Sequence, residues 1–200
     1  MLLVVTMFGA AQENPLWLRF PAISPDGKTI AFSYKGDLFT IPVTGGQARQ
    51  LTTNAAYDAY PVWSPDGQHI AFASSRESSL DVWLIARQGG NPKRLTTHSN
   101  NERPIAFLDN DHVLYSTSLM ATAQTSLLPE STFPQVYEVS TKGGRPRLFS
   151  IITMEDISIR ANGDMLYHDC KGYVPLSCNS GDVVQIVCSS LVRRWYAGLP

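Results

Sequence analysis

Two copies of one phrase decide the fold: SPDGKTIAFSY at residues 24–34 and SPDGQHIAFAS at residues 64–74. In each copy a polar turn leads into an apolar segment. Proline presets φ at the first central turn position, aspartate tolerates the second, and glycine accepts a positive φ after it. In the second copy the large residues Ile70 and Phe72 alternate with alanines. This alternation indicates a strand whose sheet is packed by neighbouring sheets on both of its faces.

The phrase is part of a longer repeat. Gly27, Gly67, Asn110 and Gly163 mark the same turn position in successive units, at steps of 40, 43 and 53 residues. The long third step contains an inserted loop at residues 120–134. The units are expected at residues 20–52, 60–96, 103–150 and 156–173.

Each unit divides into four short strands. In the second unit they are expected at about residues 61–64, 69–74, 81–85 and 93–96. Gly-Gly pairs supply a second hairpin turn in three of the units. Four strands in about 40–45 residues are typical of a β-propeller blade. The sequence therefore predicts an all-β fold, a partial β-propeller of four-stranded antiparallel blades over residues 12–173, with three blades and part of a fourth.

Composition bounds the function classes. The chain has 200 residues, of which 44% are hydrophobic and 16% charged, so it can bury a core. A formal net charge of −1 argues against a nucleic-acid partner, because phosphate contacts need a basic surface. The three cysteines, Cys170, Cys178 and Cys188, are odd in number and match no zinc spacing.

The N-terminal run MLLVVTMFGAA, residues 1–11, is apolar and ends in small residues. Gly9 and Ala11 stand where a signal peptidase reads positions −3 and −1, although the basic segment that normally precedes such a run is missing. The alternative is an ordinary buried strand. The run is too short to span a bilayer. We interpret it as an incomplete signal peptide, which predicts a periplasmic or secreted protein without a membrane span.

The last 27 residues, 174–200, change character. They carry two of the three cysteines, only three charged residues and no repeat phrase. One interpretation is an irregular continuation of the fourth blade. The other, which we favour, is a truncated or out-of-frame end, and it predicts that residues 183–187 pack poorly.

Residues that could carry chemistry are few. The chain has no G-x-S-x-G elbow and no complete catalytic triad is expected. A metal at the HDC segment, His168 to Cys170, is disfavoured, because adjacent strand residues point to opposite faces. Calcium at the acidic turns is disfavoured, because repeated turn chemistry explains these residues. The turn residues concerned are Asp26, Asp66, Asp109 and Asp111. We therefore predict no catalytic residue, no cofactor and no metal site.

Loops at one rim of the propeller are the better candidate for function, since loops carry binding while blades position them. The connections at residues 53–60, 74–79 and 97–103 would lie at the rim opposite the SPDG turns. Their mixture of charges and tyrosine suits contact with a peptide or protein; the alternative is a rim that is merely solvated. The candidate contact residues are Tyr57, Asp58, Arg76, Glu77, His98, Glu102 and Arg103.

The pattern SPDG…IAF…GG…LT resembles the PD40 (WD40-like) propeller repeat of TolB and of tricorn-type proteases. Residues 12–52 and 60–76 are similar to the start of bacterial tricorn-like serine peptidases of the S41 class. The resemblance covers residues 12–173. It implies a propeller that guides or gates peptides, followed by further blades, a PDZ domain and a serine-peptidase domain.

The chain departs from that pattern in length. Three blades and part of a fourth are fewer than the six or seven that the family suggests, and the PDZ and peptidase domains have no counterpart here. No catalytic residue is therefore carried over, and whether this chain is itself an enzyme stays open. Unpaired edges and faces of an open set of blades predict poor solubility or an oligomer.

Three functions are consistent with the sequence. The first is a non-catalytic propeller fragment of a secreted tricorn-like peptidase, whose partners are peptides or proteins. The second is a periplasmic protein-binding propeller like TolB, although TolB-like chains carry a small α/β domain before the propeller. The third is the propeller of a prolyl-oligopeptidase-type hydrolase. The reading frame downstream would distinguish them.

Overall fold

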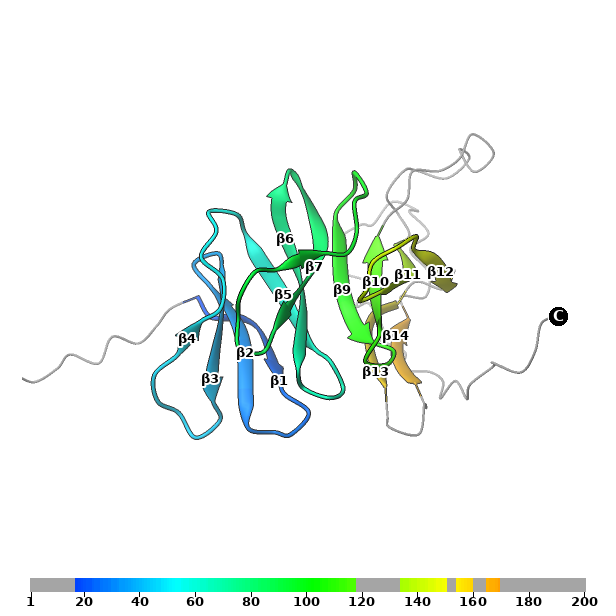
Figure 1. Cartoon of the computed structure of the whole chain (residues 1–200). Helices are drawn as coiled ribbons and strands as arrows, with labels where there is room; N and C mark the ends of the chain where they lie inside the picture. Colours follow the sequence, from blue (N-terminus) through cyan, green and yellow to red (C-terminus); the bar gives the residue numbers. More distant parts are fainter. Residues whose placement is uncertain (1–16, 118–133, 151–153, 160–164, 170–200) are drawn as a thin grey trace, which may run out of the picture.

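The computed structural model describes residues 17–117, 134–150, 154–159 and 165–169. These residues form three four-stranded antiparallel sheets and one two-stranded sheet that follow one another along the chain (Figure 1). The prediction of an all-β partial propeller is confirmed. The predictions for residues 1–11, for most of the inserted loop at 120–134, for the three cysteines and for residues 174–200 lie outside the described residues.

Each sheet uses its strands in chain order, so every connection within it joins neighbours. Blade 1 consists of β1 (Arg19–Ile23), β2 (Thr29–Tyr34), β3 (Asp37–Pro42) and β4 (Arg49–Gln50). Blade 2 consists of β5 (Asp58–Trp63), β6 (His69–Glu77), β7 (Ser79–Ala86) and β8 (Lys93–Arg94). Blade 3 consists of β9 (Glu102–Phe107), β10 (His112–Thr117), β11 (Gln135–Ser140) and β12 (Arg147–Ser150). The two-stranded sheet consists of β13 (Met154–Ile159) and β14 (Met165–Asp169).

The SPDG phrase is a closed hydrogen-bonded turn. In the second copy the Ser64 hydroxyl donates to Asp66 Oδ1 at 2.5 Å and accepts the backbone N–H of His69 at 2.9 Å. Asp66 Oδ1 also accepts the backbone N–H of Gln68 at 3.0 Å. The serine hydrogen bond lowers the pKa of Asp66 below its ordinary value. The first copy repeats this arrangement, so both carboxylates serve the turn, and Gly27 and Gly67 follow at φ of 68° and 66°.

Blade 2 is packed on both faces, as the alternation of large and small residues predicts. Its large-residue face packs against blade 1, and the residues concerned include Trp63, Ile70, Phe72 and Ile85 against Ala31, Leu38 and Leu51. Its other face packs against blade 3, and the residues concerned include Ala71, Val82, Leu84 and Leu95 against Phe107, Val113, Tyr115 and Val139. Large side chains of one blade therefore fill the smaller face of the blade before it.

The Leu-Thr pair at the end of each of the first two units continues the sheet beyond its two-residue fourth strand. Leu95 N donates to Val82 O at 2.8 Å, and Thr96 Oγ1 accepts the N–H of Val82 at 2.9 Å. Leu51 and Thr52 do the same with Leu38 in blade 1. The pair therefore closes each blade at its outer edge before the chain crosses to the next.

The connection expected at residues 74–79 differs from the structure. β6 runs on to Glu77 and β7 begins at Ser79, so the turn is reduced to Ser78, at a φ of 86°. Arg76 is the physical reason, because its guanidinium lies over the rings of Phe72 and Trp83 and keeps the end of β6 beside β7, although the register is irregular between Ser74 and Glu77.

Candidate functional site

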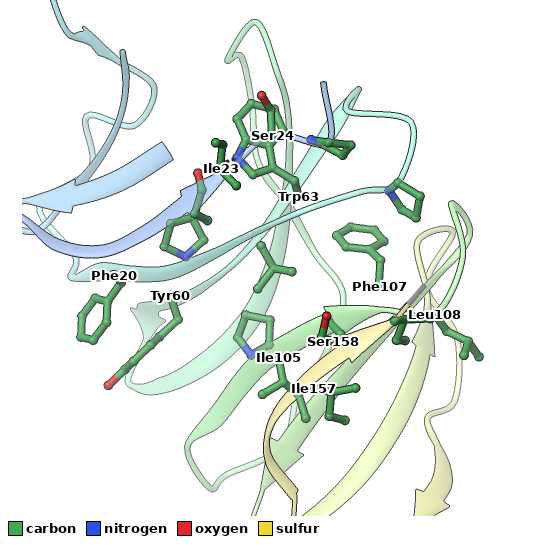
Figure 2. A pocket seen from close by; sticks show the side chains of 18 of the residues that line it. Phe20, Ile23, Ser24, Tyr60, Trp63, Ile105, Phe107, Leu108, Ile157 and Ser158 are labelled. Atoms are coloured by element: carbon green, nitrogen blue, oxygen red, sulfur yellow. Dashed lines mark hydrogen bonds between the residues drawn. The ribbon is translucent and has the colours of Figure 1, made fainter. Parts of the chain in front are cut away.

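The first strands of the blades lie side by side around a common pocket. β1 contacts β5, β5 contacts β9, and β9 contacts β13. Together they line a cavity of about 1040 Å³, which we call the axial pocket (Figure 2). Each of β1, β5 and β9 is the terminal strand of its sheet, so it turns one backbone edge away from its own blade.

Aromatic side chains form one part of the axial wall. Phe20 and Tyr60 each precede a proline and have positive φ, 53° and 55°, where the strand register shifts by a β-bulge. Positive φ is uncommon for bulky residues and persists only where the surrounding structure enforces it. The two rings lie 4.0 Å apart between centroids (Figure 2). Arg103, also before a proline, places its guanidinium 4.8 Å from the centre of the Tyr60 ring.

Phe20, Tyr60 and Arg103, one from each of three blades, thus form a continuous row that we call the axial ladder. Further along the wall, Trp63 and Phe107 end their strands, and Trp63 Nε1 donates to Ala22 O across the blade boundary at 3.0 Å. Sequence reasoning missed all of these residues except Arg103. The available signal was the aromatic-proline pair that precedes each SPDG phrase.

Asp58 and Arg76, two of the seven candidate rim residues, form a buried ion pair. Arg76 Nη2 lies 2.8 Å from Asp58 Oδ2, and the Asp58 side chain is fully enclosed. The guanidinium also lies 5.1 Å from the centre of the Trp83 ring. Removing one partner of such a pair leaves an uncompensated charge in the interior. This pair therefore ties β5 to β6, the first two strands of blade 2.

Glu102 is buried as well, at the boundary between blades 2 and 3. It pairs with Thr117 in the β9–β10 ladder, as Asp58 pairs with Ser74 in the β5–β6 ladder. Burial raises the pKa of Glu102 to about 7, a hydrogen bond from Thr96 acts against this shift, and the carboxylate of Asp81 adds to it. Arg94 lies 2.8 Å from Asp81, whose own pKa is also raised by burial.

The remaining rim candidates differ in exposure and in their contacts. Glu77 and His98 are exposed, and the His98 carbonyl accepts the hydroxyl of Ser79 at 3.1 Å. Tyr57 is 41% exposed and lines a second pocket beside blade 1. Arg103 belongs to the axial ladder. The structure thus pairs Asp58 with Arg76 and brings Arg103 to the axial pocket.

The acidic turn residues are engaged locally. Asp26 and Asp66 bond within their turns, and the Asp109 carboxylate lies 2.9 and 3.0 Å from Nδ1 of His112. Within the described ranges no group of three or more histidine, cysteine or acidic residues is placed to hold a metal ion. The side chains of His168 and Cys170 lie outside the described residues. In the part of the chain that is described, no helix is long and apolar enough to cross a membrane.

Comparison with known families places this architecture. The model of the tricorn protease N-terminal β-propeller domain matches residues 15–173. The chain belongs to this family. The tricorn-type propeller is 35% identical to tricorn protease homologue 1 of Streptomyces coelicolor over 82 residues, which are 41% of this chain and 8% of that protein. It is 33% identical to an uncharacterised protein of Agrobacterium fabrum over 79 residues, 36% of this chain and 26% of that protein.

Solved structures share the fold of this tricorn-type propeller. The tricorn protease crystal structure aligns with a TM-score of 0.59 at 23% identity, covering 77% of this chain and 15% of that one. TolB from Acinetobacter baumannii aligns with a TM-score of 0.56 at 18% identity, covering 76% of this chain and 37% of that one. The chain therefore spans a small part of the length of its relatives, and at these identities the structural likeness concerns the fold alone.

Proposed function

We propose that the axial pocket of this tricorn-type propeller binds an extended peptide and guides it along the axis, as a non-catalytic part of a serine peptidase whose chemistry resides in other domains. The observation that carries the proposal is the axial ladder, in which Phe20, Tyr60 and Arg103 present two aromatic faces and a cation on one wall of a 1040 Å³ pocket. Aromatic and arginine side chains dominate the energetics of peptide and protein recognition.

The prolines of the wall favour guidance over tight capture. Pro21, Pro61 and Pro104 lie on β1, β5 and β9, each the terminal strand of its sheet. An open strand edge normally recruits an extended peptide as an additional strand. Proline lacks the backbone N–H, so each of these strands has one hydrogen-bond donor fewer to offer to a peptide backbone. A peptide in the pocket is therefore held by side-chain contacts rather than by a continuous β-ladder, and it can advance.

Binding to the isolated chain tests the proposal. A fluorescein-labelled neutral peptide of alternating Leu and Ser is titrated with the protein, and its anisotropy is followed. We expect Tyr60→Ala to weaken binding about tenfold, because loss of an aromatic contact of this kind costs more than about 1 kcal/mol. Tyr60→Phe keeps the ring and retains binding.

The control is Leu148→Ala, an exposed residue on β12 outside the axial pocket, which leaves binding unchanged. Equal binding by Tyr60→Ala and the unaltered chain would contradict the proposal. So would an equal loss of binding in Leu148→Ala.

We also propose that the protein is exported from the cytoplasm, because residues 1–11 form an apolar run like that of a signal peptide. Residues 1–20 fused to alkaline phosphatase, an enzyme that folds actively only after export, are expected to give phosphatase activity in intact bacteria. Deletion of residues 1–11 removes that activity. An inactive fusion would argue for a cytoplasmic protein, and activity that survives the deletion would show that residues 1–11 are not the export signal.

A further inference from the structure

A second pocket lies outside the axial pocket, beside the β2–β3 turn and the segment that connects blade 1 to blade 2. Its volume is about 520 Å³, and its lining shares no residue with the axial pocket. Three aromatic residues, Trp17, Tyr34 and Tyr57, contribute to its wall. Trp17 is 70% exposed, which is unusual for the largest apolar side chain of a soluble domain. We call this cavity the rim pocket.

The backbone holds the rim pocket open. Asp58 N donates to Gly36 O at 2.7 Å, and Tyr57 N donates to the Ser75 hydroxyl at 3.0 Å, so the connecting segment is fixed to both blades. Gly36 has a φ of 92°, and a Cβ there would meet the Tyr57 ring at 3.9 Å. Trp17 itself has a φ of 78°, a conformation in which a bulky residue is strained. Such strain is characteristic of ligand-binding sites.

The charges of the rim pocket point to an acidic ligand. The Arg19 guanidinium lies 5.3 Å from the centre of the Trp17 ring, and Lys35 Nζ lies 5.3 Å from that of Tyr34. Both cations are exposed at the pocket. The one acidic residue of the lining, Asp37, is engaged by Gln50 at 3.0 Å and by the Thr52 hydroxyl at 3.3 Å. The lining therefore carries two cations against one carboxylate, and that carboxylate is already hydrogen-bonded within the protein.

We propose that the rim pocket is a docking site for an acidic, proline-containing segment of a partner protein, with a proline seated among Trp17, Tyr34 and Tyr57 and acidic side chains at Arg19 and Lys35. Grooves lined by aromatic rings bind proline-rich segments, because these are already extended and lose little entropy on binding. Trp, Tyr and Arg are also the residues enriched at the energetic centres of interfaces. This site is separate from the axial pocket and goes beyond peptide guidance.

The test uses the whole chain and three labelled peptides: one of alternating Glu and Pro, one with Lys in place of Glu, and one with Gly in place of Pro. The Glu-Pro peptide is expected to bind at least tenfold more tightly than either of the others. Its affinity falls as salt is raised, because exposed charges are screened. Trp17→Ala and Arg19→Glu each weaken binding of the Glu-Pro peptide about tenfold.

Matched controls lie at the opposite end of blade 1. Val43→Ala removes an exposed apolar side chain, and Lys28→Glu reverses an exposed charge; neither changes binding of the Glu-Pro peptide. Thermal unfolding verifies that Trp17→Ala is folded, as expected for so exposed a side chain. Equal affinity for the Lys-Pro or Glu-Gly peptide would overturn the proposal. Loss of Glu-Pro binding in Tyr60→Ala but not in Trp17→Ala would assign that peptide to the axial pocket and overturn it too.

Discussion

Asp58 and Glu102 hold the same ladder position in successive blades, and their surroundings differ. Asp58 has Arg76 at 2.8 Å, so its charge is matched inside the protein. The carboxylate of Asp81, which is also buried, raises the pKa of Glu102, and Arg94 lowers it by less. Since burial disfavours the charged form of a carboxyl group and a like charge adds to that effect, Glu102 is held with a pKa of about 7. Glu102 therefore titrates close to neutral pH.

This raised pKa predicts a pH-dependent stability. The folded-state pKa of about 7 exceeds the ordinary value of 4.5, so the folded chain binds the proton more tightly than the unfolded chain. The resulting stabilisation is complete below about pH 4.5 and is lost as pH rises through about 7. Glu102→Gln cannot lose a proton, and we expect it to raise the free energy of unfolding above pH 7 by up to about 3 kcal/mol relative to the unaltered chain.

Urea unfolding at about pH 5 and about pH 8 measures this difference. The control is Glu77→Gln, which removes an exposed carboxylate and leaves the pH dependence in place. If the free energy of unfolding of the unaltered chain and of Glu102→Gln changed equally with pH, the assignment of the proton to Glu102 would be wrong.

At the scale of elements, the strands of blade 2 were predictable from sequence because each carries its own local signal. Proline, aspartate and glycine punctuate the first turn, and the strand expected at residues 69–74 lies within β6. The extension of β6 to Glu77 was not predictable, because the segment SSRESS is polar and reads as a loop. Its order depends on Arg76 reaching Asp58 and the Trp83 ring, contacts made with other strands.

The candidate sites were harder to predict than the strands. Asp58 and Glu102 begin strands that lie between two blades, so they are buried although the surrounding sequence is polar. The charge and polarity of a segment do not show on which face of the sheet a carboxylate side chain lies. The aromatic-proline pairs at Phe20 and Tyr60 were visible in the repeat. Their place on the axial wall follows only once the first strand of each blade is known to be the innermost.

At the scale of the whole molecule, the two boundaries between the described four-stranded blades follow one packing rule. The large-residue face of blade 2 packs against the smaller-residue face of blade 1. The large-residue face of blade 3 packs against the smaller-residue face of blade 2 in the same way. The ladder pairs show that blade 1 has an equivalent large-residue face, because Ile30 pairs with Ile41 and Phe32 with Phe39 just as Ile70 pairs with Ile85 and Phe72 with Trp83. None of the described blades packs against that face of blade 1.

The exposed part of this face, at Ile23, predicts self-association of the chain in solution. Ile23 pairs with Ile30 at the end of β1 and is 61% exposed, at the position where Trp63 is buried against blade 1 in the next unit. Contiguous apolar surface and open sheets promote association. We expect sedimentation velocity to show concentration-dependent oligomers for the unaltered chain. Ile23→Lys places a charge on this face and shifts the chain towards monomer.

Val43→Lys is the matched control for self-association, because Val43 is also exposed but lies on the β3–β4 turn outside the large-residue face. It changes the charge equally and leaves the oligomers in place. Because the Ile23 side chain is exposed and contributes little to the core, Ile23→Lys is expected to unfold as cooperatively as the unaltered chain. If the unaltered chain were entirely monomeric at high concentration, the prediction would be wrong, and the apolar face of blade 1 would be covered within one molecule.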